Sequence, residues 1–278
     1  AYEICACRVG SEMCIRDREI TPYVPTTDLS TLGRALPQGV QEKGFEVRTF
    51  MPKYGCINER RNQLHEVIRL SGLNVIIDDT DHPLIIKVAS LQSARTQVYF
   101  IDNDDYFHYT TEKVLETESS PADNDERAMF FVKGTIETVK KLRWEPSIIH
   151  CVGWISALAP LYLKRLYSDD PTFSGAKVIY AIRSEGFEGS LDPRFKEKLK
   201  MCDIPEEDLK VLGESVSVND LHKLAIDFSD GLILSSDNIA PEVLEYAKTS
   251  GKPILGYSEN GQEGFFDSYA NFYTELLK

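Results

Sequence analysis

Short apolar, β-rich runs alternate with helical segments through the second half of the chain, and this alternation constrains the fold most strongly. A strand over 147–151 is followed by a helix over 155–167 and a strand over Lys177–Ile182. The pattern continues with helices near 193–202, 206–211 and 219–228, a strand over Gly231–Leu234, a helix from about Ile239 with Pro241 in its first turn, and a strand over 253–256. Short connections of this kind favour an α/β fold with a Rossmann-like, doubly wound, largely parallel sheet and right-handed crossovers.

The first half contains one clear amphipathic helix and several β-rich runs. Leu29, Leu32, Leu36 and Val40 recur at helical spacing and predict a helix over 27–43. Asp28 stands at a cap or first-turn position, Gly44 supplies the stop, and Pro37 is expected to kink or shorten the helix. The predicted strands of this half are 45–51, Leu73–Ile77, 84–88 and 98–101.

Two further helices complete the expected domain. A long helix is predicted from Asp123 or Asn124 through Trp144, after a polar region at 112–125 that we expect to loop out. The final run, 265–277, is apolar at helical spacing, so we expect it to close the domain and to mark a genuine chain end. The 278 residues then form one large domain, residues 19–278.

Composition excludes several classes of function. Acidic residues outnumber basic ones by 44 to 31, and the net charge of −13 disfavours nucleic acid as a partner. No apolar run approaches the length of a membrane-spanning helix, so we expect no membrane association. Six scattered cysteines do not form a secreted disulfide framework, which favours the cytoplasm. Cys5 and Cys7 lack a second pair at zinc-finger spacing, so we expect no metal site.

Residues 1–18 differ in character from the rest of the chain. They show neither helical nor strand periodicity, and they lack the apolar segment and cleavage site of a signal peptide. Protein-like sequence begins abruptly at Glu19. We therefore interpret 1–18 as a non-native segment, of the kind produced by translated adapter sequence, that replaced a native first strand.

The loops that follow the strands are the candidate binding positions, because ligands of doubly wound sheets sit beyond the carboxyl ends of the strands. Four such places are 25–28, 102–105, 152–154 and 183–188. No glycine-rich dinucleotide fingerprint, phosphate-binding P-loop or serine nucleophile motif is present, so we expect neither those phosphate-binding modes nor a covalent hydrolase. The acidic residues after the strands are interpreted as solvated loop groups, with general acids or a cation site as the alternatives.

Six stretches, in order, resemble the N-terminal half of bacterial glycogen and starch synthases, in the short form found in Bacteroidetes-like bacteria. They are 19–24, 33–37, 98–102, 125–127, 144–150 and 153–158, and the resemblance covers about residues 19–258. It implies one half of a two-domain GT-B-type glycosyltransferase that transfers glucose from ADP-glucose to an α-1,4-glucan with retention of configuration. In that family the site lies between the domains, the N-terminal half carries glucan contacts and the other half most of the nucleotide-sugar site. No cofactor is implied.

The family's site motifs are altered in this sequence. Its Lys-Thr-Gly-Gly loop falls on 25–28, its His-Asp-Trp on 152–154, and its His-Asn pair on 183–184. The phosphate-binding lysine is absent, and Asp28 would repel a phosphate. The resemblance implies the following substrate-binding positions and assigns no catalytic residue: Thr26, Thr27, Asp28, His150, Val152, Gly153, Trp154, Arg183 and Ser184.

Two functional hypotheses follow, and a small-molecule protein unrelated to this family is a third. The first is an ADP-glucose-dependent glucosyltransferase that works with a second polypeptide carrying the missing donor domain. The second is a non-catalytic relative that binds glucan or a partner protein and regulates glycogen metabolism, since a fold can outlast its reaction. Trp154, Tyr106 and Phe107 would stack on sugar rings or belong to the core, and His150 would bind substrate or be a buried core histidine.

Overall fold

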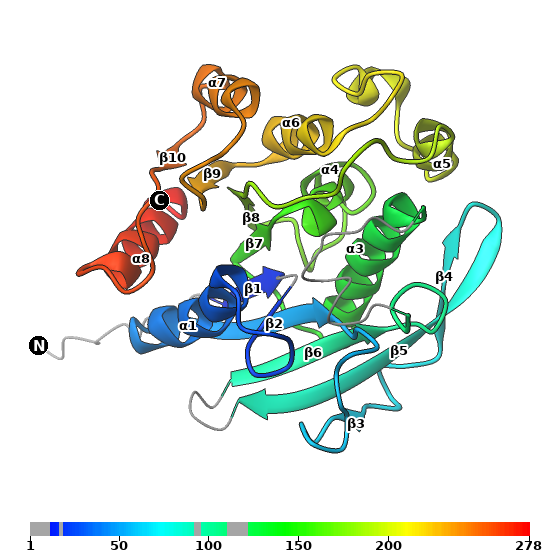
Figure 1. Cartoon of the computed structure of the whole chain (residues 1–278), viewed down its shortest axis with the longest axis horizontal. Helices are drawn as coiled ribbons and strands as arrows, with labels where there is room; N and C mark the ends of the chain where they lie inside the picture. Colours follow the sequence, from blue (N-terminus) through cyan, green and yellow to red (C-terminus); the bar gives the residue numbers. More distant parts are fainter. Residues whose placement is uncertain (1–11, 17–18, 92–95, 110–121) are drawn as a thin grey trace, which may run out of the picture.

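The protein folds around one mixed β-sheet flanked by helices on both faces (Figure 1). The computed structural model describes residues 12–16, 19–91, 96–109 and 122–278. Within these residues the strands are β1 (Glu12–Arg16), β2 (Glu46–Pro52), β3 (His65–Glu66), β4 (Leu73–Ile77), β5 (Thr80–Leu91), β6 (Thr96–Asp102), β7 (Ile148–Val152), β8 (Lys177–Ile182), β9 (Gly231–Leu234) and β10 (Ile254–Leu255). Each strand that the sequence predicted is present within a few residues of its expected bounds.

The strand order is that of a doubly wound sheet with an antiparallel extension. It runs β10-β9-β8-β7-β1-β2-β6-β5-β3, with β4 paired to β5. The strands from β10 to β6 are all parallel, whereas β5 pairs antiparallel with β6, β3 and β4. The chain moves outward from β1 to β2 and β6, then returns to place β7 on the other side of β1. The topological switch point therefore lies between β1 and β7, which confirms the predicted fold class.

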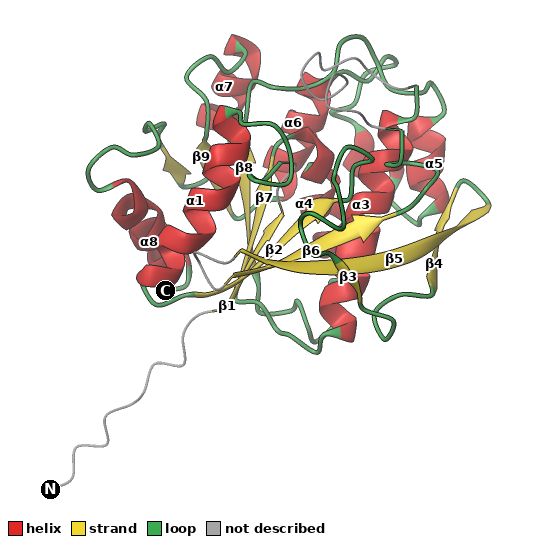
Figure 2. Ribbon diagram, turned by 60° about the horizontal axis from the view of Figure 1, so that its bottom comes forward, coloured by secondary structure: helices red, strands yellow, loops and turns green. Residues whose placement is uncertain are grey.

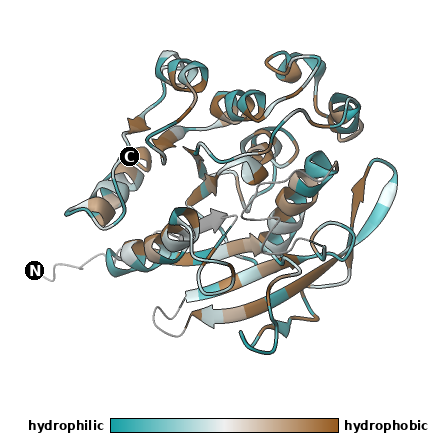
Figure 3. Cartoon of the chain, viewed as in Figure 1, coloured by the Kyte–Doolittle hydropathy of each residue, from teal (hydrophilic) through white to brown (hydrophobic). Residues whose placement is uncertain are grey.

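Helices form a layer on each face (Figure 2). α1 (Asp28–Glu42) and α8 (Phe265–Leu276) share one apolar cluster with Ile148, Ile179 and Ile233 of the sheet. The helices that contribute to the opposite cluster are α3 (Asn124–Lys141), η1 (Trp154–Ser156), α4 (Leu158–Arg165), α5 (Phe195–Met201), η2 (Glu206–Leu209), α6 (Val218–Phe228) and α7 (Pro241–Thr249). Hydrophobic residues follow the strands and the inner helix sides, as Figure 3 shows. Because successive residues of a strand face opposite layers, the parallel strands are buried on both sides.

The central strand β1 lies within residues 1–18, the segment that we interpret as a replacement of a native first strand. Residues 12–16 lack strand periodicity, yet they pair in parallel with both β2 and β7, with Met13 opposite Val47 and Ile148. Backbone hydrogen bonding to two neighbours can hold a strand whose side-chain pattern is weak, because the sheet ladder does not depend on side-chain identity. Neither β2 nor β7 is left with an open edge along β1. That residues 1–18 are non-native stays a prediction.

Three helix predictions differ from the structure in detail. α1 continues to Glu42, so Pro37 does not shorten it; buried apolar residues before and after Pro37 offset the hydrogen bond that proline removes. α3 begins at Asn124 after an N-cap at Asp123, as predicted, but ends at Lys141 rather than Trp144. The helix expected over 155–167 divides into η1 and α4. Of the polar region 112–125, residues 112–121 lie outside the described residues, whereas 124–125 already belong to α3.

Candidate functional site

A cavity of about 450 Å³ opens at the carboxyl ends of β8, β9 and β10, beside the first turn of α1. We call it the strand-end pocket. Its wall is formed by Asp28 of α1, residues 183–185 after β8, 235–238 after β9, 257–260 after β10, and Tyr269 of α8. It lies on the edge of the sheet where ligands of doubly wound folds bind.

The strand-end pocket brings together three residues predicted from sequence: Asp28, Arg183 and Ser184. Arg183 is 6% exposed, and its guanidinium donates to both carboxylate oxygens of Glu185 and, at 2.9 Å, to the carbonyl oxygen of Ser235. The backbone N–H of Ser184 donates to the Ser236 hydroxyl at 3.2 Å. Arg183 therefore fixes the two loops against each other, and its charge is already matched by a carboxylate.

The predicted residues Thr26 and Thr27 lie just before α1 and do not line the pocket. Thr27 is the N-cap: its hydroxyl oxygen accepts the Ser30 N–H at 3.0 Å, while the Ser30 hydroxyl accepts the Thr27 N–H at 2.8 Å. The Thr27 hydroxyl also donates to a Glu19 carboxylate oxygen at 2.9 Å. A capping box of this kind satisfies two backbone N–H groups at the start of the helix. Thr27 therefore stabilises α1, and it does not line the cavity in which a phosphate contact was expected.

Val152, Gly153 and Trp154 lie at the switch point, at the end of β7, outside the strand-end pocket. Gly153 adopts φ +69° and ψ −179°, a conformation essentially confined to glycine, and its N–H donates to the Ala181 carbonyl at 3.1 Å. This turn directs Trp154 inward, where its ring packs edge-on against Phe187 with 5.2 Å between centroids. Trp154 thus packs in the core, as do Tyr106 and Phe107.

His150 is a buried histidine behind the strand-end pocket. It is 1% exposed, and the Tyr273 hydroxyl lies 3.0 Å from its Nδ1. Burial lowers the pKa of His150 to about 3, so the imidazole is neutral. Its ring centroid lies 6.3 Å from that of Tyr269, which lines the pocket. His150 therefore supports the pocket wall from the core side and is not among the residues that line the cavity.

The predicted acidic loop after β6 belongs to a separate ion-pair cluster. The Asp102 carboxylate lies 2.7 Å from the Lys87 ammonium, and Lys87 also lies 2.7 Å from Glu59. Burial raises the pKa of Asp102 although Lys87 opposes the shift. Asn103 side-chain oxygen accepts the N–H groups of Asp105 and Tyr106, which closes the turn. These ion pairs and hydrogen bonds hold the loop in place, so the groups that form them have a structural role.

The charge of the strand-end pocket is strongly acidic. Its described lining residues include four carboxylates, of Asp28, Glu185, Asp237 and Glu259, and one cation, Arg183. The other polar groups are hydroxyls and amides, and Tyr257 at the rim is 46% exposed. Carboxylates and hydroxyls accept hydrogen bonds from sugar hydroxyls, whereas the carboxylates repel phosphate. The arrangement suits a neutral polyhydroxylated ligand.

Sequence reasoning missed residues 235–238 and 257–260. Both segments directly follow strands that the sequence predicted, 231–234 and 253–256. The same rule that selected 183–188, that ligands bind beyond the carboxyl ends of parallel strands, would have selected these two loops.

Among the described residues, no helix is long and apolar enough to cross a membrane.

Comparison with solved structures shows a shared fold. The catalytic domain of starch synthase IV from Arabidopsis thaliana, solved with ADP and acarbose, superposes with a TM-score of 0.73 at 18% identity, covering 90% of this chain and 52% of that one. The sheet, its switch point and this match show a doubly wound, Rossmann-like α/β fold that the chain shares with that catalytic domain.

Comparison at the sequence level identifies the family. The starch synthase catalytic domain family matches residues 16–258. Glycogen synthase of Chlorobium luteolum is 36% identical over 229 residues, which are 81% of this chain and 46% of that protein. Glycogen synthase of Chlorobaculum tepidum is 34% identical over 237 residues, 82% of this chain and 46% of its own. The chain belongs to the glycogen and starch synthase family. It spans about half the length of the curated relatives it matches.

Proposed function

We propose that this chain serves in glucosyl transfer from ADP-glucose to an α-1,4-glucan, and that its strand-end pocket holds the glucan. Family membership supports the reaction class. The related plant enzyme was solved with ADP and acarbose, which is consistent with a nucleotide and a carbohydrate ligand. The cytoplasm remains the compartment in which we expect this reaction.

The pocket's charge is the observation that carries the glucan assignment. Four carboxylates surround one arginine, and that arginine is already paired with Glu185. A nucleoside diphosphate in this pocket would lose its hydration, and its phosphates would be repelled by the carboxylates. Glucan hydroxyls instead find acceptors in the carboxylates and serines, while the exposed ring of Tyr257 offers a face for a sugar ring. The donor's phosphates then require cations from elsewhere, for which we propose a second polypeptide.

A non-catalytic glucan-binding role is the second candidate. The observation that favours it is the replacement just before and at the start of α1: Pro25 occupies the position expected for the family's lysine, and the capping Thr27 and Asp28 occupy those of its two glycines. Developing charge on a leaving diphosphate needs preorganised cations, and none comes from this segment. In this case the chain would bind glucan and regulate its storage without transferring glucose.

Two measurements test the proposal on the full chain. Calorimetric titration with a maltooligosaccharide should show binding, weakened about fivefold by Tyr257→Ala, because stacking on an aromatic ring contributes about 1 kcal/mol. Tyr109→Ala is the matched control, since Tyr109 is similarly exposed at 44% but does not line the pocket. Absence of glucan binding, or equal loss in both variants, contradicts the assignment.

ADP release from ADP-glucose separates the two candidate roles. The isolated chain should release no ADP in the presence of primer, while addition of a polypeptide with the donor half should restore release if the chain serves in catalysis. Glucan binding that persists without any such restoration favours the regulatory role. Primer-dependent release by the isolated chain would show that our argument from the pocket's charge is wrong.

A further inference from the structure

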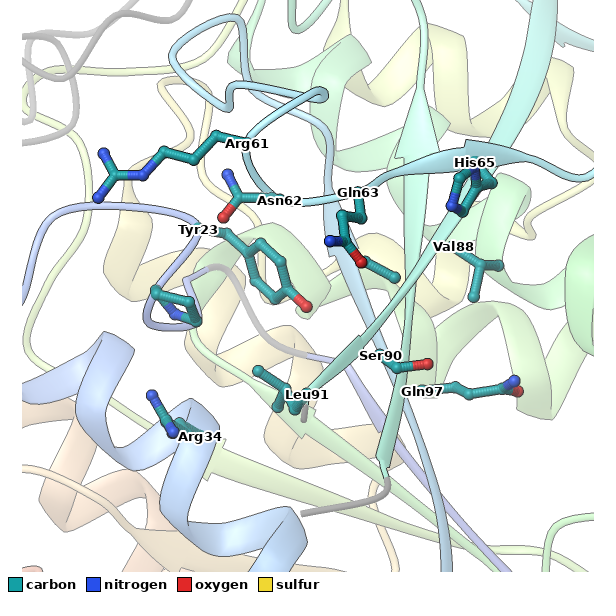
Figure 4. Close-up of a pocket in the computed structure, with 12 residues that line it drawn as sticks. Tyr23, Arg34, Arg61, Asn62, Gln63, His65, Val88, Ser90, Leu91 and Gln97 are labelled. Atoms are coloured by element: carbon teal, nitrogen blue, oxygen red, sulfur yellow. The ribbon is translucent and has the colours of Figure 1, made fainter. Parts of the chain in front are cut away.

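A second cavity, of about 700 Å³, opens at the far side of the sheet where the described part of β5 ends (Figure 4). We call it the edge pocket. Residues 61–63 form one wall, 88–91 of β5 a second, and Pro22, Tyr23 and Arg34 a third. None of the described residues that line it lines the strand-end pocket. It therefore lies outside the site assigned to glucan.

The edge pocket is basic in an acidic protein. Its described lining residues include Arg34, Arg61 and His65 and no aspartate or glutamate, although the chain has 44 acidic residues against 31 basic ones. Asn62, Gln63 and Gln97 add amide groups that can donate hydrogen bonds. In Figure 4 the guanidinium groups of Arg34 and Arg61 lie toward the same side, above and below Tyr23. The described lining thus supplies two fork-shaped donors and contains no carboxylate, which suits an anion.

The wall that carries Arg61 is rigid. The Asn58 side-chain oxygen accepts the Arg61 N–H at 2.8 Å, and the Asn58 carbonyl accepts both the backbone N–H of Asn62 at 3.1 Å and its side-chain amide at 2.9 Å. Leu64 is buried in the main core and its N–H donates to the Glu59 carbonyl. The turn is thus fixed before any ligand binds, which lowers the entropic cost of binding.

The opposite wall is also fixed, and its described lining residues, Pro22, Tyr23 and Arg34, carry no negative charge. The Tyr23 ring packs edge-on against Phe100, with 4.9 Å between centroids. Burial raises the pKa of the Tyr23 hydroxyl to about 12, although the nearby Arg34 charge acts in the other direction. Tyr23 therefore stays neutral and able to donate a hydrogen bond at physiological pH. An anion in the pocket meets donors on both walls.

We propose that the edge pocket binds the phosphate group of a small phosphorylated molecule, held between Arg34 and Arg61. Guanidinium groups bind phosphate oxygens through paired N–H donors, and the amides of Asn62 and Gln63 can contact what the phosphate carries. The cavity is larger than inorganic phosphate needs, so a phosphate ester of a small polyol fits it better. The proposal uses other residues than the proposed glucan site and stands independently of it.

The test is calorimetric titration of the full chain with glucose 1-phosphate, inorganic phosphate and maltose. Both phosphates should bind and maltose should not compete with them. Arg61→Gln and Arg34→Gln should each weaken phosphate binding about tenfold, because a charge-assisted hydrogen bond contributes about 1.5 kcal/mol or more. Arg60→Gln is the matched control: Arg60 is an exposed neighbour that does not line the pocket, so binding should change less than about twofold.

Each outcome bears on the proposal. Tighter binding of glucose 1-phosphate than of inorganic phosphate supports an ester as the ligand, while equal affinity supports phosphate recognition with the free ion as its source. Unfolding midpoints of all three variants show whether the half-buried Arg34 is needed for folding. If Arg34→Gln does not fold, Arg61→Gln still tests the proposal, because Arg61 is exposed. Equal affinity of Arg60→Gln and Arg61→Gln, or displacement of phosphate by maltose, overturns the proposal.

Discussion

The strand-end pocket and the edge pocket border the same sheet but have opposite charge. The first has four carboxylates around one paired arginine, and the second has two arginines and a histidine with no described carboxylate. The first lies where parallel strands end, and the second beside the last described residues of an antiparallel strand. The comparison teaches that a net charge of −13 describes the whole surface and does not decide what a particular cavity binds.

Both pockets are built from loops, helix residues and, in the edge pocket, part of β5, all held in place by the core. Their ligand preferences should therefore survive a change elsewhere that weakens the fold. A buried ion-pair cluster in the other helical layer offers this test. The Lys198 ammonium lies 2.7 Å from carboxylate oxygens of both Asp125 and Glu126, and Lys198 is 2% exposed. The hydrogen bonds and charges of these carboxylates raise the Lys198 pKa, although burial opposes the shift.

Lys198→Met gives the largest expected effect. Removing the ammonium leaves the buried Asp125 carboxylate without its cation, so the free energy of unfolding should fall by about 3–5 kcal/mol. Urea denaturation measures this loss. Under conditions where the variant is folded, glucan and phosphate affinities should be unchanged. Lys200→Met is the control, since Lys200 is an exposed residue of the same helix and should cost less than about 1 kcal/mol. A small loss in Lys198→Met would show that the buried cluster is dispensable.

A pH change should weaken the fold through two buried histidines in the half that holds the strand-end pocket. Burial lowers the pKa of His150 to about 3 and of His222 to about 4. Above pH 6.5 both are neutral in the folded and unfolded chains and have no effect on stability. Below pH 6.5 the unfolded chain binds protons that the folded chain does not, so stability falls as the pH decreases toward 4. Glucan affinity is therefore best compared with phosphate affinity above pH 6.5.

His222→Asn isolates one of these histidines. The Tyr180 hydroxyl lies 2.7 Å from His222 Nδ1, and an asparagine amide can occupy the place of that nitrogen. Between pH 7 and pH 5 the wild-type chain should lose about 2 kcal/mol more stability than the variant, because one pKa unit corresponds to about 1.4 kcal/mol. Urea denaturation at the two pH values measures the difference. Identical pH slopes would mean that His222 titrates equally in both states.

The sequence predicted the parallel part of the fold because its strands are buried on both faces. Runs such as 178–182 and Gly231–Leu234 are short and rich in apolar residues, and helical periodicity separates them. β1 escaped prediction because it is held by two neighbouring backbones, a non-local effect that no sequence window contains. The prediction that Pro37 shortens the helix was wrong for a similar reason, because tertiary packing of α1 outweighs the local preference against proline.

The sequence predicted where the candidate site lies better than it predicted which residues form it. Strand-end logic placed Arg183 and Ser184 in the pocket, but it could not show that Glu185 neutralises Arg183 or that Gly153 turns Trp154 inward. These outcomes depend on side-chain pairing and on one backbone dihedral. The edge pocket was missed entirely, because its described walls come from segments 22–23, 34, 61–63, 65, 88–91 and 97, which have no common motif and meet only in the folded chain.

Asp28→Asn gives the smallest effect and tests why the strand-end pocket should reject phosphate. Asp28 is exposed in the first turn of α1, where a negative charge is favoured by the helix dipole, so its loss should cost less than about 1 kcal/mol of stability. One fewer carboxylate in the pocket should strengthen ADP binding by about two- to threefold, the effect expected for an exposed charge. Calorimetric titration with ADP at low salt measures this, since salt screens the interaction.

Asp267→Asn is the control that makes this small change interpretable. Asp267 also lies in the first turn of a helix, α8, and pairs with Lys43, but it does not line the pocket. If local charge governs the pocket, ADP affinity rises in Asp28→Asn alone, and phosphate binding at the edge pocket is unchanged in both variants. If both variants raise ADP affinity equally, the net charge of the protein accounts for the repulsion, and the contrast between the two pockets loses its electrostatic basis.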